Sequence, residues 1–373
     1  MIVHVLAFMI GCVLVLLAIR SAVRTFVVPR GGPPDRVTRW IFLFNRALIE
    51  VPLRRAPKAQ REAALAYYAP VTLLTLPIVW LAFVLLGYTA MYWALDSRSW
   101  SASLTTSRFS LLYLGSNVGR IPGGTVIAFS ETVISLLLAA ILVSYLPAIY
   151  SAFSLREQVV TGLETLAGTP PTPLKLIKRH FLIKGMGHIS ELWPPWQAWF
   201  EQVEESHTAL IPLVFYRSPQ PNRSWVTAAG AILDTASIVA SSLDRARDAR
   251  AELCIRAGYL CLQRVASPLG IPFNPDPAPN DPISVSREEY DAVYDALADL
   301  GVPLKPDRDQ AWREFAGWRV NYDAVLIGLA VITSAPLGLW SSDRVPHLHS
   351  PFVTARRLAH QTAEAAMAGR LRG

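Results

Sequence analysis

Three stretches of this chain are too long and too apolar to fold as ordinary soluble segments. Residues 1–19 and 63–95 contain no Asp, Glu, Lys or Arg, and residues 126–150 contain one charge, Glu131. A helix of about 20 apolar residues crosses the hydrocarbon core of a bilayer. The sequence therefore predicts an all-α membrane protein with three transmembrane helices. Arginines follow the first apolar stretch and do not precede it, which indicates an uncleaved anchor and not a signal peptide.

The positive charge of the chain lies in its apolar half. Residues 1–151 carry 13 Lys and Arg against 5 Asp and Glu, whereas residues 152–373 carry 22 against 23. Charged residues make up 17% of the chain, compared with about 25% in an ordinary globular protein. A nucleic-acid-binding protein carries its basic residues on a folded soluble surface. This distribution excludes nucleic acid as a partner and indicates the lipid bilayer.

The basic residues also predict the orientation of the spans. Residues 20–61 hold ten Lys and Arg against two acids, Asp35 and Glu50. Because such loops stay in the cytoplasm, we expect the N-terminus outside the cell membrane and everything after the third helix in the cytoplasm. Residues 40–49 place apolar side chains beside arginines, which fits an amphipathic helix in the membrane interface. A soluble loop that packs on the C-terminal half fits equally well.

The loop between the second and third helices contains an apolar run that an external hairpin does not need. Residues 109–114 form this run, and a glycine-bearing segment, 115–124, follows it. Non-helical backbone occurs at membrane depth only where it is buried in protein or lines a water-filled cavity. The pattern therefore predicts a re-entrant segment, with a short helix that enters the bilayer and a loop that returns.

This order of helix, short helix, glycine-bearing loop and helix resembles the pore domain of potassium channels over residues 68–155. Val118 and Gly119 match the Val-Gly pair of the family's filter, and Pro122 matches a proline after it. In that family, stacked backbone carbonyls replace the hydration shell of the ion. The resemblance implies a homotetramer that passes a monovalent ion along a pathway formed by Gly115, Ser116, Asn117, Val118, Gly119 and Arg120.

Two positions depart from the pattern of that family. Arg120 stands at the place of the filter tyrosine, and Ile121 stands at the place of the second glycine. Four guanidinium groups near the mouth of a tetrameric pore repel cations unless each is paired or turned outward. The pore fold is therefore expected more strongly than potassium selectivity, and no cofactor is expected.

Two residues of the third helix carry further hypotheses. An ionisable side chain within a span marks a functional site by default. Glu131 either lines the ion path or neutralises Arg120 behind the filter, and we favour the second because it removes the cost of both charges. Pro147 leaves the Val143 carbonyl without its helical donor. It is a gate candidate, although a kink that serves only packing is the commoner case.

The C-terminal half has the pattern of a helical domain. Apolar residues recur at helical spacing over 225–243 and 246–265, and Ser286 and Glu289 form a capping box at the start of another helix. Residues 324–340 are uncharged but short for a span, and arginines follow them. We expect a buried helix and a loop there.

The C-terminal half contains no motif that points to catalysis. A glycine-rich phosphate loop and a dinucleotide fingerprint are both missing from the sequence. One Glu-x-x-His, from Glu204 to His207, falls short of the two that a di-iron bundle needs. Cys254 and Cys261 lie seven residues apart on one predicted helix, which is too far for a disulfide, so we expect buried thiols. The prediction is that this chain is not an enzyme.

These patterns divide the chain into an anchor, a basic loop, a pore-like unit and two cytoplasmic subdomains. Their predicted boundaries are 1–29, 30–62, 63–155, 156–270 and 271–373. The predicted function is passive ion permeation through a homotetrameric pore with a degenerate filter. The alternative is a non-conducting membrane scaffold or sensor that keeps the pore fold.

Overall fold

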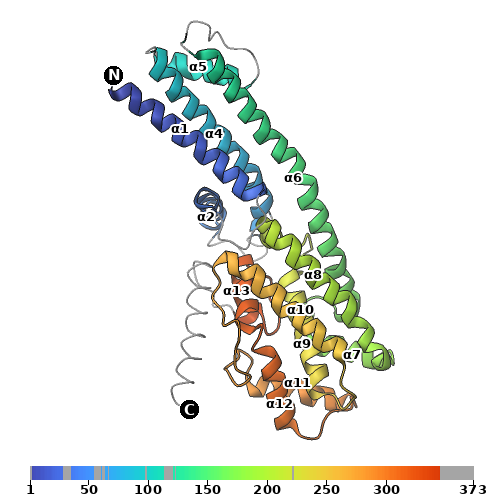
Figure 1. The fold of residues 1–373 in the computed structure, drawn as a ribbon. Helices are drawn as coiled ribbons and strands as arrows, with labels where there is room; N and C mark the ends of the chain where they lie inside the picture. Colours follow the sequence, from blue (N-terminus) through green and yellow to red (C-terminus); the bar gives the residue numbers. More distant parts are fainter. Residues whose placement is uncertain are drawn as a thin grey trace, which may run out of the picture. The chain divides into compact units, whose positions relative to one another are not determined.

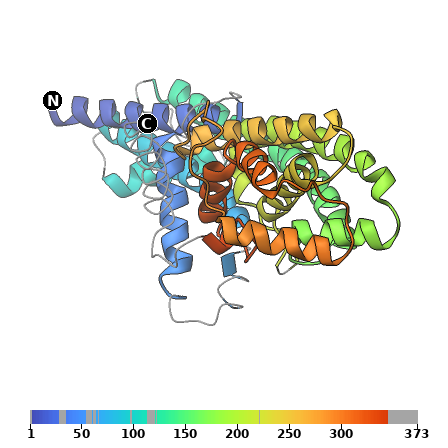
Figure 2. The same ribbon diagram turned by 90° about the horizontal axis from the view of Figure 1, so that it is seen from below.

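The computed structural model describes residues 2–27, 35–53, 60, 64–65, 67–96, 99–112, 121, 123–220 and 222–344. Apart from one isolated bridge between Leu243 and Leu304, the regular elements of these residues are helices. They form two compact units, which Figures 1 and 2 show as ribbons. Unit 1 comprises 1–29, 34–57 and 67–151, and unit 2 consists mainly of residues after Ser151. The long helix α6, Gly124–Ala167, begins in unit 1 and ends in unit 2.

Unit 1 contains the three predicted spans. They are α1 (Ile2–Ala22, which continues as a π-helical segment, η1, Val23–Val27), α4 (Tyr68–Asp96) and the first part of α6. Two shorter helices accompany them, α2 (Arg36–Glu50) and α5 (Trp100–Leu111). The most apolar windows of α1 and α6 are only 17% buried, so most of their apolar side chains face outward. A lipid environment removes that mismatch, since it lets apolar side chains stay uncovered by protein.

The helices α1 and α4 lie side by side and cross closely at two glycines (Figures 1 and 2). A Cβ atom on Gly11 would lie 2.4 Å from the Gly87 carbonyl oxygen, and one on Gly87 would lie 2.8 Å from the Gly11 carbonyl oxygen. Small residues let membrane helices approach until their backbones touch, and van der Waals packing then holds the pair together. The contact of α1 with α4 therefore depends on the absence of side chains at Gly11 and Gly87.

Unit 2 is a bundle of helices around α9 (Trp225–Ser242). The 3₁₀ segments η2 (Met186–Leu192) and η3 (Ile211–Phe215) flank α8. Single 3₁₀ turns, η4 (Ser267–Leu269) and η5 (Ser342–Arg344), follow α10 and the last helix. The other helices are α7 (Pro173–Leu182), α8 (Trp193–Ala209), α10 (Ala249–Ala266), α11 (Arg287–Asp299), α12 (Arg308–Arg319) and α13 (Asp323–Thr333).

By length and composition, α9 is a fourth candidate membrane span. A fifth arises if α12 and α13, which are bent by 54° at the break between them, count as one. The apolar window of α9 is 94% buried, in contrast to the 17% of α1 and α6. Its side chains are thus already covered by the helices of unit 2, so α9 has no face left for lipid.

Several sequence-based expectations for unit 2 are confirmed. The helices predicted over 225–243 and 246–265 are α9 and α10. Ser286 accepts from the Glu289 amide at 3.3 Å while Glu289 accepts from the Ser286 amide at 2.9 Å, which is the capping box at the start of α11. The uncharged stretch 324–340 consists of the buried helix α13 and a following loop.

We predict that Gly11→Ala destabilises the protein because the added methyl group forces α1 and α4 apart. Overpacking of this kind costs about 1–3 kcal/mol, which thermal unfolding in detergent would show as a lower midpoint. Gly162→Ala in α6 is the matched control, since nothing lies within 4 Å of its added Cβ. Equal midpoints for the two variants would contradict a packing role for Gly11.

Candidate functional site

The short helix α5 lies against α4, well below the end of that helix. Ser99 caps α5 by accepting from the Ala102 amide at 3.3 Å. Further along, the Ser107 hydroxyl donates to the carbonyl of Leu85 at 3.1 Å. Leu85 precedes Asp96, the last residue of α4, by 11 residues, or about 16 Å of helix at about 1.5 Å per residue. The chain thus turns back after α4 and α5 descends beside it.

The side of α5 that faces the other helices carries serine hydroxyl groups. Ser103, Ser107 and Ser110 are its buried residues, and all three are polar. The carbonyl of Ser110 accepts from Thr132 of α6 at 3.0 Å. Since Ser107 binds α4 and Ser110 binds α6, the helix α5 is fixed between the two flanking helices by hydrogen bonds.

Glu131 of α6 lies at the centre of this contact and is fully buried. One carboxyl oxygen lies 2.5 Å from the Ser107 hydroxyl, and the other accepts from Tyr92 of α4 at 3.2 Å. Both side-chain oxygens therefore meet hydroxyl groups, one from α5 and one from α4. We call Tyr92, Ser107, Ser110, Glu131 and Thr132 the hydroxyl cluster.

The contacts of Glu131 suit a neutral carboxylic acid. A buried carboxylate without a cationic partner is strongly disfavoured in an apolar medium. In the acid form, Glu131 donates to the Ser107 oxygen, and the hydrogen of Ser107 is free for the Leu85 carbonyl. Each of these three groups then has a partner of the right kind. Glu131 is thus buried between three helices, and both interpretations of it, as an ion-path residue and as the partner of Arg120, stay predictions.

The predicted filter lies outside the described residues. This applies to Gly115, Ser116, Asn117, Val118, Gly119 and Arg120. The proposed pairing of Glu131 with Arg120 therefore also stays a prediction. The structure places the start of the short helix at Trp100, nine residues before the apolar run at 109–114, because Ser99 supplies its cap.

Pro147, the gate candidate, lies within the continuous helix α6. Ser144 donates to the Ala140 carbonyl at 2.8 Å, so its hydroxyl does not serve the Val143 carbonyl that Pro147 leaves without a donor. Val143, Ser144 and Pro147 are all exposed in the single chain. A gating role for Pro147 stays a prediction.

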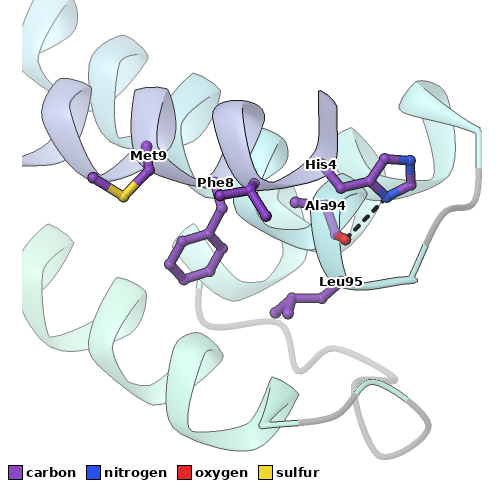
Figure 3. A pocket seen from close by; sticks show the side chains of 6 residues that line it. His4, Phe8, Met9, Ala94 and Leu95 are labelled. Carbon is purple, nitrogen blue, oxygen red and sulfur yellow. Dashed lines mark hydrogen bonds between the residues drawn. The ribbon is translucent and has the colours of Figure 1, made fainter. Parts of the chain in front are cut away.

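A second feature of unit 1 is an apolar pocket of about 470 Å³ where α1 begins and α4 ends (Figure 3). The His4 imidazole donates from Nδ1 to the Ala94 carbonyl at 3.2 Å and packs against Trp93, with ring centroids 5.0 Å apart. The pocket is lined by His4, Val5, Phe8, Met9, Ala94 and Leu95. This lining suits hydrocarbon and offers little to an ion.

In unit 2, the sequence analysis missed a buried arginine near the end of α6. Arg156 is 1% exposed and forms an ion pair with Glu157 at 2.8 Å. It also donates to the carbonyls of Leu213 and Tyr216, at 3.0 and 2.7 Å, and to Nε2 of His207, at 3.1 Å. Arg156 thereby fastens the last turns of α6 to α8 and to the 3₁₀ segment after it. Leu213, Tyr216 and His207 lie more than 50 residues away from Arg156 in the sequence, so no local pattern predicts these contacts.

His207 accepts from Arg156, and this fixes its protonation. A guanidinium group only donates, so Nε2 carries no hydrogen and Nδ1, which lies 3.0 Å from the Ser206 hydroxyl, carries it. Burial and the adjacent Arg156 guanidinium hold the pKa of His207 well below its usual range. His207 is therefore a neutral structural residue and not a metal ligand. Among the described residues, no group of three or more His, Cys, Asp and Glu is placed to hold a metal ion.

A second buried charge cluster lies around α9. Arg319 of α12 pairs with Asp234 of α9 and, at 2.8 Å, with Asp323 of α13. Tyr322 also donates to Asp234, at 2.9 Å. Cys254 and Cys261 are buried free thiols, as expected, and burial raises the pKa of Cys254 to about 12. Both features are those of a protein core.

No protein-family model, curated protein or solved structure matches this chain.

We predict that Glu131→Gln keeps the stability of the protein and Glu131→Ala does not. The amide of Gln donates to Ser107 and accepts from Tyr92 as the neutral acid does. Alanine removes the carboxyl group that Ser107 and Tyr92 contact in this buried site, a loss of about 1–3 kcal/mol. Thermal unfolding in detergent measures both variants. If Glu131→Gln is as unstable as Glu131→Ala, the carboxyl group is charged and has an ionic partner.

We also predict that stability falls below neutral pH through His207. Its folded-state pKa is lower than its unfolded-state pKa of about 6.5, so protons favour the unfolded chain. The contribution is fully present above about pH 6.5 and is lost as the pH falls below it. His207→Gln, which still accepts from Arg156, should weaken the drop in unfolding midpoint between pH 7.5 and 5.5.

His188→Gln is the control for that experiment, because His188 is a surface residue, with its side chain 77% exposed. It should leave the pH dependence unchanged. An equal pH dependence of the wild-type protein and His207→Gln would contradict the assignment.

Proposed function

We propose that this chain is a subunit of a homotetrameric, ion-channel-like membrane protein. Its N-terminus lies outside the cell membrane and unit 2 lies in the cytoplasm. One chain supplies a quarter of the pore: α4 is the outer helix, α5 the pore helix and α6 the inner helix. The filter is the backbone of Gly115, Ser116, Asn117, Val118 and Gly119, which begins four residues after Leu111, the last residue of α5.

The observation that carries this proposal is the position of α5. The Ser107 hydroxyl lies within hydrogen-bond distance of α4 and of α6, about 16 Å below the end of α4. A hairpin outside the membrane would bring α5 no deeper than the ends of its neighbours. A helix that enters beside one span and is followed by a returning segment is the arrangement that pore loops require.

The exposed surface of α6 supports an assembly of several chains. In the single chain its apolar window is only 17% buried, and polar as well as apolar residues of its lower half are exposed, Ser144 among them. The inner helices of a tetramer line one central path and pack against their neighbours. In that arrangement, polar residues of α6 face the water of the central path, and some of its apolar residues contact neighbouring chains.

Selectivity for potassium is not part of the proposal. Arg120 places a positive charge beside the filter in each of four chains, and all four charges oppose the entry of a cation unless each is paired or turned outward. The proposed site contains no catalytic group, and the proposal includes no enzymatic activity. If the tetramer forms but passes no ion, the chain is a scaffold or sensor that keeps the pore fold.

The test is ion flux through proteoliposomes that contain the full-length protein, measured separately with potassium, sodium and chloride. We expect Arg120→Gln to raise cation flux by about tenfold or more, since about 1.4 kcal/mol in the entry barrier is a factor of ten. Arg108→Gln, at an exposed position of α5, is the matched control and should have a smaller effect.

The mass of the complex in detergent is measured beside the flux. A monomer would contradict the pore. A tetramer without flux for any ion, in the wild-type protein and in Arg120→Gln, would contradict conduction and leave the scaffold.

A further inference from the structure

The helix α2 has three distinct sides, which its sequence and its contacts define. One side packs against the rest of unit 1 through the buried residues Thr38, Ile41, Phe42, Asn45 and Arg46. A second side carries the exposed arginines Arg36 and Arg39. The third side is apolar and is covered by nothing in unit 1.

We call Trp40, Phe44, Leu48 and Val51 the apolar ridge of α2. They recur at intervals of four, four and three residues, so they lie in one row along the helix. Trp40, Phe44 and Leu48 are 72%, 67% and 61% exposed. A row of four large apolar side chains exposed to water makes a soluble protein prone to aggregation.

The packed side fixes α2 at the beginning of α4, far from α5. Tyr68 donates to the Phe42 carbonyl at 3.0 Å, and Asn45 donates to Thr75 at 2.8 Å. Thr38 is also within hydrogen-bond distance of Thr25, at 2.8 Å, where α1 has just ended. The contacts of α2 thus fall on the first two turns of α4 and on the segment after α1.

The direction of α2 differs from that of the spans. In both Figure 1 and Figure 2, α2 runs crosswise to α1 and α4. A helix that lies across the ends of membrane spans lies along the membrane surface. There the hydrocarbon boundary and the head groups meet, and a helix with one apolar and one basic side fits both.

The charges around α2 match the anionic head groups of a phospholipid leaflet. Among the described residues, four exposed arginines lie at this end of unit 1: Arg20, Arg24, Arg36 and Arg39. Each basic residue near an anionic leaflet contributes about 1 kcal/mol of attraction. Trp40 belongs to the residue type that concentrates at the membrane–water boundary.

We propose that α2 is a lipid-binding helix, with its apolar ridge in the acyl region of the membrane and Arg36 and Arg39 on lipid phosphates. The occupant of the ridge is the leaflet that surrounds the spans. This surface holds one end of unit 1 at a fixed depth and prefers anionic phospholipids. The inference requires that α1 and α4 cross a bilayer, but it does not require that α5 forms a pore.

The test places nitroxide spin labels on single cysteines at positions 40, 44 and 48 and, for comparison, at 36 and 39. The full-length protein carries Cys12→Ser and is reconstituted into vesicles of phosphatidylglycerol and phosphatidylcholine; Cys254 and Cys261 are buried. Collisions with oxygen report hydrocarbon, and collisions with a water-soluble nickel chelate report water. We expect an oxygen-to-nickel ratio several-fold higher at 40, 44 and 48 than at 36 and 39.

Two results would overturn the proposal. Equal access of the nickel chelate to positions 44 and 39 would mean that the ridge lies in water. Protection of positions 40, 44 and 48 from both reagents would mean that protein covers the ridge, either unit 2 or a second copy of the chain. Neither result depends on ion flux, so failure here is distinct from failure of the pore.

A second measurement tests the lipid preference without changing the ridge. Arg36→Gln combined with Arg39→Gln should lower the enrichment of spin-labelled phosphatidylglycerol over phosphatidylcholine around the protein. Arg247→Gln combined with Arg250→Gln removes two exposed arginines from unit 2 and is the matched control. Equal enrichment in both double variants would overturn the assignment of lipid phosphate to Arg36 and Arg39.

Discussion

Hydrogen bonding inside an apolar medium is the constraint on which unit 1 depends. A polar group that enters the bilayer core must find its partner within the protein, because water is absent there. The buried side of α5 is made of serines, which could not stay in hydrocarbon alone. Ser107 and Ser110 meet α4 and α6, and Glu131 joins the two sides. The serines of α5 therefore specify where this helix lies between α4 and α6.

The two ends of unit 1 hold different short helices against α4. At about 1.5 Å per residue, the 29 residues of α4 extend for about 44 Å, whereas the hydrocarbon core is about 30 Å thick. In a bilayer, both ends of a helix of this length reach the head groups. At its beginning, Tyr68 and Thr75 hold the crosswise helix α2. Nearer its other end, Leu85 and Tyr92 contact the descending helix α5.

Helices that are marked by a local sequence pattern could be predicted from the sequence. Features that depend on residues far away in the chain could not. Long apolar stretches with at most one charged residue located α1, α4 and α6. The same criterion also admits α9, whose partners in unit 2 cover it. The single acid of α9, Asp234, was the available signal for an interior helix, because it needs the arginine that α12 supplies. The serines of α5 have no hydrophobic period, so only the capping residue Ser99 marks where that helix begins.

The helix α6 contributes a residue to two buried polar networks, and these two networks differ in kind. Glu131 lies among hydroxyl groups, whereas Arg156 binds a carboxylate, two carbonyls and a neutral imidazole. In unit 1, a neutral acid suits an environment in which no water can stabilise a charge. In unit 2, the arginine keeps its charge because Glu157 balances it. Between them lies Pro147, where one helical hydrogen bond is missing four residues before the boundary of the units at Ser151. The helical hydrogen bond that Pro147 removes is thus lost between the two networks.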